Sequence, residues 1–256
     1  MDHPLMSPDK DDASKGPSRR DEFIRAQREL SFSFERKTSL CAPFVALLPV
    51  SGASVSILAT SLGQSTVCSS NSTASRLDEL QFDLGEGPCW EALASGQPVL
   101  TTDLKAAQSV WPIFIGAVYD DPQASKVGAM FAFPLTVGSL DIGAVDLFTT
   151  QITELTLSEV ADASALADVA AWQVLRSILQ DPANDQALDS DGLPPSPSSR
   201  REVHQATGMV LAQLNISAAD AALLIRAHAF ASGRTVREVA TDIVERRLDF
   251  LSGERP

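Results

Sequence analysis

The C-terminal 56 residues constrain the fold of this chain most, because three short helical patterns follow one another there with no strand pattern between them. The patterns cover 202–214, 218–232 and 236–248, and each places apolar residues at helical spacing. Each apolar stripe is narrow and rich in alanine, so the helices can approach closely but bury little surface. We therefore predict a small three-helix bundle over 201–256 that needs a dimer partner or a neighbouring domain for stability.

Capping residues mark where these helices begin and end. Ser217 with Asp220, and Thr235 with Glu238, are start signals in which a hydroxyl accepts from an unpaired backbone N–H and an acid sits at the positive helix end. The predicted stops are Asn215 and Gly233, which tolerate left-handed backbone. The local signals therefore agree with three separate helices.

Five runs of sequence in this segment carry a family resemblance. They are His204 to Val210 (HQATGMV), Ser217 to Ala221 (SAADA), Arg226 to Ala229 (RAHA), Val239-Ala240 and Ile243-Val244. In this order they resemble the ANTAR domain, a three-helix RNA-binding output module of bacterial transcription antitermination regulators. The resemblance covers essentially all of 201–250. It implies a dimer that binds paired hairpin loops in nascent RNA and so prevents a terminator from forming.

The acidity of the chain, with a net charge of −13, is confined to its middle. Residues 1–40 carry net charge 0, residues 41–199 carry −14 and residues 200–256 carry +1. All eight basic residues of this last segment are arginines, whose planar guanidinium binds phosphate and stacks on bases. A near-neutral bundle predicts weak nonspecific binding, so recognition would depend on RNA shape and unstacked loop bases.

We single out five residues as candidate RNA contacts: Arg201, Gln205, Gly208, Arg226 and Arg234. For any one arginine, pairing with the acids of the same segment on a solvated helix face is an equal alternative. Gly208 costs about 0.8–1 kcal/mol inside a helix, which favours a close approach there by RNA backbone or, equally, by another helix.

Composition divides the rest of the chain. Residues 1–20 are polar and charged and are expected to form a disordered tail, and 21–39 have the spacing of an N-terminal helix. Residues 40–180 are predicted to form the main domain, and the Pro-, Ser- and Asp-rich 181–200 a linker. The sequence has no membrane-length apolar run and no secretory signal, which favours the cytoplasm. The three cysteines lack metal-site spacing and are expected to be reduced, with no disulfide.

Helix and strand patterns alternate through 40–180. Strand patterns fall at 54–60, 64–69, 98–102, 127–137 and 142–148, and helical patterns at 73–82, 89–95 and 156–179. Strands that are mostly antiparallel, with helices at both ends of the domain, predict an α+β sandwich.

A second resemblance lies within this domain. The residues that carry it are Leu80 to Cys89 (LQFDLGEGPC), Gly96 to Val99 (GQPV), Trp111-Pro112 and Phe131 to Leu135 (FAFPL). Over 40–180 they resemble a GAF domain of the type fused to ANTAR in actinobacterial regulators. The resemblance implies a sheet with a small-molecule pocket, and dimerisation through the flanking helices.

The ligand of such a pocket is not determined by the sequence. We expect Phe82, Cys89, Trp111, Phe131 and Phe133 to line it, although aromatic residues at such spacing are more often core. The only histidines, His3, His204 and His228, lie outside the domain, so neither a histidine-ligated haem nor a metal is expected there. Cys89 opens a helix after a Gly-Pro turn, which makes a redox role possible, but a small buried hydrophobe is the commoner role of a free cysteine.

No enzyme motif stands out. The chain has no nucleophile elbow, phosphate-binding loop or metal cluster, and the acid pairs Asp78-Glu79 and Asp120-Asp121 are expected to be solvated surface charge. The sequence thus predicts a regulator that couples a small-molecule or redox signal to RNA binding. Two alternatives remain: an adaptor whose bundle docks a partner protein, and a DNA-binding repressor, for which only Arg237 is placed at the start of a helix.

Overall fold

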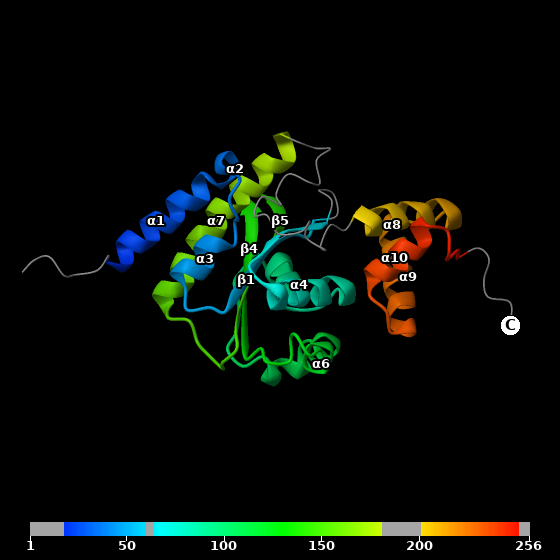
Figure 1. The fold of residues 1–256 in the computed structure, drawn as a ribbon, viewed down its shortest axis with the longest axis horizontal. Helices are drawn as coiled ribbons and strands as arrows, with labels where there is room; N and C mark the ends of the chain where they lie inside the picture. The colour runs from blue at the N-terminus through cyan, green and yellow to red at the C-terminus, as the bar shows by residue number, and fades with distance from the viewer. Residues whose placement is uncertain (1–17, 60–63, 181–200, 251–256) are drawn as a thin grey trace, which may run out of the picture.

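The computed structural model describes residues 18–59, 64–180 and 201–250 (Figure 1). Residues 18–180 form one layered unit, here called the α/β domain, and 201–250 form a second unit, the C-terminal bundle. The predicted linker 181–200 and residues 1–17 of the predicted tail lie outside the described residues. Ser18 to Arg20 are described, and they begin a helix, so the predicted tail extends too far.

A five-stranded antiparallel sheet forms the centre of the α/β domain, in the order β2-β1-β5-β4-β3. The strands are β1 (Gly52–Ile57), β2 (Ser65–Ser69), β3 (Val99–Thr101), β4 (Ala129–Val137) and β5 (Leu140–Thr149). Gly138, with φ of 61°, makes the tight turn between β4 and β5. The predicted strands are all present, with shifted ends.

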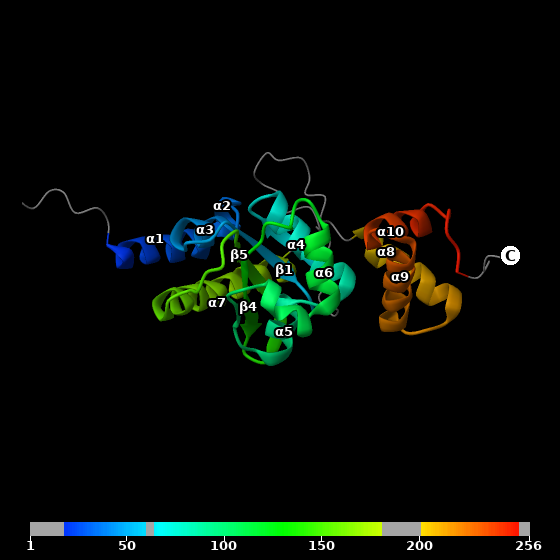
Figure 2. The ribbon, with the colours of Figure 1, turned by 90° about the horizontal axis from the view of Figure 1, so that it is seen from below.

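Helices cover both faces of this sheet (Figures 1 and 2). One face is covered by α1 (Arg19–Ser31), α2 (Ser33–Arg36), α3 (Ala42–Leu47) and α7 (Leu157–Gln180). The other is covered by α4 (Ser72–Leu84), α5 (Pro88–Ser95), η2 (Lys105–Ser109) and α6 (Pro112–Asp120). The predicted α+β sandwich is therefore confirmed. Helix α6 is not predicted from the sequence, because its run of apolar residues lacks a polar face that would mark a helical period.

Residues on alternate positions of each strand pack into different cores, as the two-residue period of a strand requires. Phe131, Phe133 and Val145 belong to a large apolar core with α1, α3 and α7. Met130 and Phe148, their neighbours in the strands, belong to a second core with α4 and α6. The α/β domain therefore has an apolar core on each side of its sheet.

The C-terminal bundle consists of α8 (Arg201–Leu214), α9 (Ala218–Ser232) and α10 (Val236–Val244). The predicted caps are present: the Ser217 hydroxyl accepts from the Asp220 N–H, and Thr235 and Glu238 form a reciprocal capping box. Asn215 and Gly233 adopt the left-handed conformation, with φ of 52° and 66°. The predicted three-helix bundle is confirmed together with its start and stop signals.

The expectation of three reduced cysteines is wrong. Cys41, which precedes α3, and Cys68 in β2 form a disulfide with a Cα–Cα distance of 6.2 Å. The two residues are 27 positions apart, so no short spacing motif announces the pair. Pairing of β2 with β1, where Cys68 lies opposite Val55, brings Cys68 beside the segment that enters α3. Cys89 is buried and takes no part in this disulfide.

Candidate functional site

The predicted RNA contacts occupy different surfaces of the C-terminal bundle. Gln205 and Gly208 lie exposed on α8, and Arg201 is the first residue of that helix. A Cβ atom built on Gly208 meets no atom of the described chain within 4 Å. No helix therefore packs closely against Gly208 in the described structure, which removes one of the two explanations for a glycine here. The other explanation, approach by RNA backbone, stays a prediction.

Arg226 of α9 faces the α/β domain rather than solvent. Its guanidinium carbon lies 5.3 Å from the ring centroid of Phe82 and 5.9 Å from that of Trp90. A Cβ on Gly85 would lie 3.3 Å from a terminal nitrogen of the same guanidinium. Arg226 is therefore a cation–π contact between the two units, of the kind that strengthens when water is excluded.

Two hydrogen bonds also join the two units. The Val236 N–H, at the start of α10, donates to Asp83 Oδ2 at 3.2 Å. His204 Nε2 lies 2.6 Å from the Gln64 carbonyl oxygen, which can accept the imidazole N–H. Phe82 is buried among the apolar residues of the bundle, so the end of α4 supplies an aromatic side chain to the bundle core.

Arg234 pairs within the bundle. Its Nη2 lies 2.6 Å from Asp242 Oδ2, and Arg247 binds the other oxygen of Asp242 at 2.6 Å. The hydrogen bonds from Arg234 and then from Arg247 lower the pKa of Asp242. Arg247 also pairs with Glu245. For Arg234, the alternative of an arginine that neutralises acids of its own segment fits this geometry.

The predicted ligand-pocket residues do not meet in one place. Phe131 and Phe133 lie in the core under α7, whereas Trp111 lies in the core under α6 on the opposite face of the sheet. Phe82 packs against the bundle, and Cys89 packs with Leu58 and Ala144. Strand alternation and the separate helices that carry the other three residues distribute the set over four clusters. Their role as a common pocket remains a prediction without support from this packing.

A buried polar group lies instead between β1, β5 and α4. Asp78 is buried, and its carboxylate accepts from the hydroxyls of Ser56 and Thr66. The expectation that Asp78 is solvated is therefore wrong, whereas its neighbour Glu79 pairs with Arg76 at 2.6 Å. Asp78 lies on the face of α4 that packs on β1, where helical periodicity buries every third or fourth residue.

Asp146 in β5 is the second buried acid of this group, with 5% of its surface exposed. Gln81 Nε2 donates to Asp146 Oδ2 at 2.8 Å, and Asp146 Oδ1 has no hydrogen-bond partner among the described residues. Burial, and secondarily the charge of Asp78, raises the pKa of Asp146 to about 8. At neutral pH this carboxyl group therefore holds its proton.

Gln81 links this acid to the surface that faces the bundle. Its Oε1 accepts from the Cys89 N–H at 2.8 Å, and its carbonyl oxygen accepts from Trp90 Nε1 at 2.7 Å. The next two residues of α4, Phe82 and Asp83, contact the bundle. The end of α4 thus connects the interior of the α/β domain with the C-terminal bundle.

Gln81, Asp83 and Asp146 are not among the site residues predicted from the sequence. Asp146 carries a usable signal, because an acid in the middle of an apolar strand is rare unless it has a specific partner. Gln81 and Asp83 have no comparable signal, because their importance comes from contacts with residues far away in the sequence.

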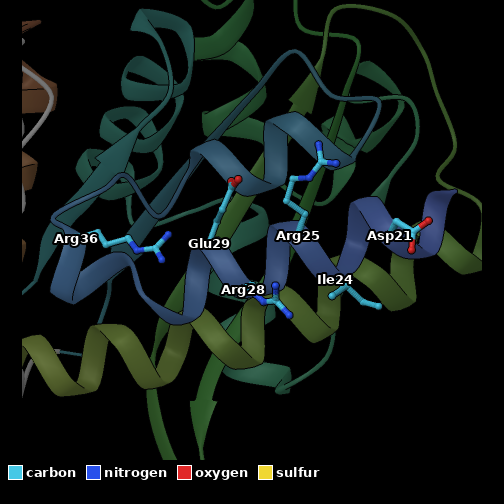
Figure 3. Close-up of a pocket in the computed structure, with 6 residues that line it drawn as sticks. All are labelled: Asp21, Ile24, Arg25, Arg28, Glu29 and Arg36. Atoms are coloured by element: carbon cyan, nitrogen blue, oxygen red, sulfur yellow. The ribbon is translucent and has the colours of Figure 1, made fainter. Parts of the chain in front are cut away.

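An open hollow lies on α1 and α2, and none of the predicted pocket residues lines it (Figure 3). Its lining residues are Asp21, Ile24, Arg25, Arg28, Glu29 and Arg36. All of them are exposed, and acidic and basic groups are mixed along it. It has the features of a solvated helix surface rather than of a built ligand site.

Within residues 18–59, 64–180 and 201–250, no three His, Cys, Asp or Glu side chains are grouped so that they could hold a metal ion. No single helix in these ranges is long and apolar enough to cross a membrane. Taken together, α8 and α9 have the length and composition of a span, but a bend of 109° separates them.

Comparison with known proteins identifies both units. A family model for the ANTAR domain matches residues 196–244, and one for the GAF domain matches 43–172. The GAF domain of a phosphoenolpyruvate-protein phosphotransferase from Coxiella burnetii is 12% identical, with a TM-score of 0.47, over 63% of this chain and 97% of that one. The free methionine-R-sulfoxide reductase of Neisseria meningitidis is 13% identical, with a TM-score of 0.43, over 63% and 91%. No curated protein sequence matches the chain significantly. The two family models occur in the predicted order.

Proposed function

Because the chain belongs to the GAF domain family and carries a C-terminal ANTAR domain, we propose that it binds paired hairpin loops in nascent RNA and favours antitermination when its GAF domain receives a signal. The combination of a sensory and an RNA-binding domain makes the chain a signal-regulated regulator. The proposal involves no catalytic step.

One observation carries this proposal: the ANTAR match over 196–244 includes the three helices α8, α9 and α10, of which α9 and α10 begin with side-chain caps. Gln205 and Gly208 give α8 an exposed polar surface with room for close approach. The near-neutral charge of the segment favours recognition through loop bases over general attraction to phosphate.

Dimerisation through the helices that flank the GAF domain would bring two bundles to one RNA. Large apolar side chains on α1 and α7 support this step. Trp172 and Leu179 of α7 are 61% and 71% exposed, and Ile24 of α1 is also exposed. Exposed apolar groups of this size on neighbouring helices are typical of protein interfaces.

For the signal, a small ligand or a redox change is proposed. The buried group of Asp78, Gln81 and Asp146 is the place where binding would be transmitted to α4, since Asp146 Oδ1 has no hydrogen-bond partner within the part of the chain that the structure describes. Cys89 supports a redox role less well, because its side chain is buried against Leu58 and Ala144 and is shielded from oxidants.

A filter-binding titration of the full chain against dual-hairpin RNA tests the function. We expect retention that weakens when one hairpin loop is replaced by an unrelated sequence of equal length. If no RNA is retained at low salt, with or without cell extract as a source of signal, the proposed function is wrong.

A second function, docking of a partner protein, is favoured by one surface of the bundle. Leu223 and Phe230 of α9 are 63% and 70% exposed. Size-exclusion chromatography of nuclease-treated and untreated lysates separates the two functions. Stoichiometric protein that survives nuclease supports docking, whereas RNA that co-elutes only without nuclease supports antitermination.

A further inference from the structure

The contact between the two domains places an aromatic ring and a carboxylate on the bundle at the same time. Phe82 and Trp90 lie under the guanidinium of Arg226, with centroids 5.3 and 5.9 Å from its carbon. The neighbour of Phe82, Asp83, accepts from the Val236 N–H at the start of α10. Two consecutive residues of α4 thus present a flat apolar ring and an anion to two neighbouring helices.

A nucleotide presents the same two groups. Arginine stacks on the faces of unpaired bases as it does on aromatic side chains. The first N–H groups of a helix bind phosphate oxygens for the same electrostatic reason that they accept a carboxylate. The surface formed by Arg226 and the start of α10 is therefore chemically suited to an unstacked base with its phosphate.

From this we propose that the end of α4 acts as an intramolecular mimic of RNA, which occupies a nucleotide-binding surface around Arg226 and keeps the bundle closed. This inference rests on the proposed function, because it assumes that the bundle binds RNA. It adds a subsite, its ligand chemistry and the segment of the chain that competes for it. Signalling then consists of releasing Phe82 and Asp83 from the bundle.

The negative charge of the α/β domain would further reduce RNA binding in the closed state. Residues 41–199 carry a net charge of −14, and residues 200–256 carry +1. The α/β domain, which holds most of this negative charge, contacts the bundle through Phe82 and Trp90. The net negative charge of the α/β domain would repel the phosphates of an approaching RNA, and this repulsion falls when the bundle moves beyond about 10 Å, the screening length at 0.1 M salt. Separation of the domains would therefore favour RNA both by freeing Arg226 and by removing an unfavourable field.

The interior of the GAF domain has a direct connection to this contact. Gln81 precedes Phe82 and is held by Asp146 of β5, while its backbone and side chain hold Trp90 and the start of α5. A ligand that takes the hydrogen bond of Gln81 from Asp146 would shift both aromatic partners of Arg226. The mimic is thus placed where a signal in the core can withdraw it.

The test compares full-length variants in two measurements: affinity for fluorescently labelled dual-hairpin RNA, and radius of gyration by small-angle X-ray scattering. Phe82→Ala should open the molecule and tighten RNA binding about tenfold, and Asp83→Ala about threefold. Asp83 is only half-buried, so its variant carries the test if Phe82→Ala does not fold. The matched control is Phe32→Ala, which removes an aromatic ring 5.2 Å from Arg36 without touching the bundle, and should change neither quantity.

Each outcome decides between the two proposals. A larger radius with tighter RNA binding supports mimicry. A larger radius with unchanged affinity overturns mimicry and leaves the RNA function intact, and so does an unchanged radius in both variants. If no form of the protein retains RNA, even with an increased radius, the proposed function fails and the mimic fails with it.

Discussion

The two domains differ in how far each can stabilise itself. The GAF domain has an apolar core on each face of its sheet, with buried aromatic side chains in both, and a disulfide between Cys41 and Cys68. The ANTAR bundle has a core of valine, alanine and isoleucine, to which the GAF domain adds Phe82. A thin core that takes an aromatic side chain from its neighbour links the stability of the bundle to the position of that neighbour.

The largest expected effect comes from Phe133→Ala. Phe133 is fully buried in the core under α7 and does not contact the bundle. Removing such a ring should lower the free energy of unfolding of the GAF domain by about 3–5 kcal/mol. Because the bundle loses Phe82 when the GAF domain unfolds, the temperature at which the bundle unfolds should decrease as well. Differential scanning calorimetry of the full chain measures both transitions.

The control is Val110→Ala, which truncates an exposed apolar side chain of the same domain. It should change the free energy of unfolding of either domain by no more than about 0.5 kcal/mol. If Phe133→Ala unfolds the GAF domain while the bundle transition stays in place, the bundle is independent and the contrast between the two domains is wrong.

Loss of the Cys41–Cys68 disulfide is expected to have the next largest effect. The bond closes a loop across 27 positions, and a loop of this length contributes roughly 3–4 kcal/mol by restricting the unfolded chain. Cys68→Ser should therefore reduce the urea midpoint of the GAF domain, and dithiothreitol should have no further effect on the variant. In the matched control, Cys89→Ala, dithiothreitol should still destabilise the protein. Equal midpoints for wild type with and without reductant would contradict the disulfide.

The helices of the bundle could be predicted because their capping signals are local in sequence. The site could not be predicted, because it is formed by contacts between residues that are far apart in sequence. The caps at Ser217 and Thr235 and the left-handed Asn215 involve residues within one turn, so the sequence contains the whole signal. The strands were recognised from alternation, but alternation does not say which face holds a ligand. For this reason Phe131 and Phe133 were grouped with Trp111, which lies across the sheet.

The same limit explains the other errors. The disulfide depends on how β2 pairs with β1, and pairing is not encoded within either cysteine's neighbourhood. Asp78 appeared solvated because a helix shows its buried face only when its partner strand is known. Arg226 was singled out from position and resemblance, and the sequence could not reveal that Phe82 and Trp90 cover it.

The buried acid Asp146 should make the stability of the GAF domain depend on pH. Burial raises the pKa of Asp146 from 3.8 to about 8, so between these values the folded protein keeps a proton that the unfolded chain loses. This group's contribution to stability is therefore intact below about pH 4 and falls as the pH rises towards 8. Asp146→Asn removes the titration and should stabilise the protein above pH 8 by on the order of 2 kcal/mol.

Urea denaturation of wild type and Asp146→Asn at several pH values measures this difference. Acids that do not interact with Asp146 contribute equally to both proteins. The difference between the two unfolding free energies therefore reports Asp146 together with its neighbour Asp78, whose charge acts on it. Asp141→Asn, at an exposed position of the same strand, is the control and should leave the pH dependence unchanged. A difference that stays constant from pH 4 to pH 9 would show that the carboxyl group does not hold a proton in the folded state.

The smallest effect tests whether the exposed surface of α8 is kept for RNA at the expense of stability. Gly208 lies inside the helix, and an added Cβ meets no described atom within 4 Å. Gly208→Ala should therefore raise the unfolding free energy of the bundle by up to about 1 kcal/mol, because alanine restricts the unfolded chain and favours the helix. If RNA backbone approaches this position, the same methyl group should weaken RNA retention.

The control is Ala212→Gly, one turn further along the exposed side of α8, which should destabilise the bundle by a similar amount. A Gly208→Ala protein that is more stable and binds RNA as well as wild type would remove α8 from the RNA surface and leave α9 and α10, around Arg226, as its site.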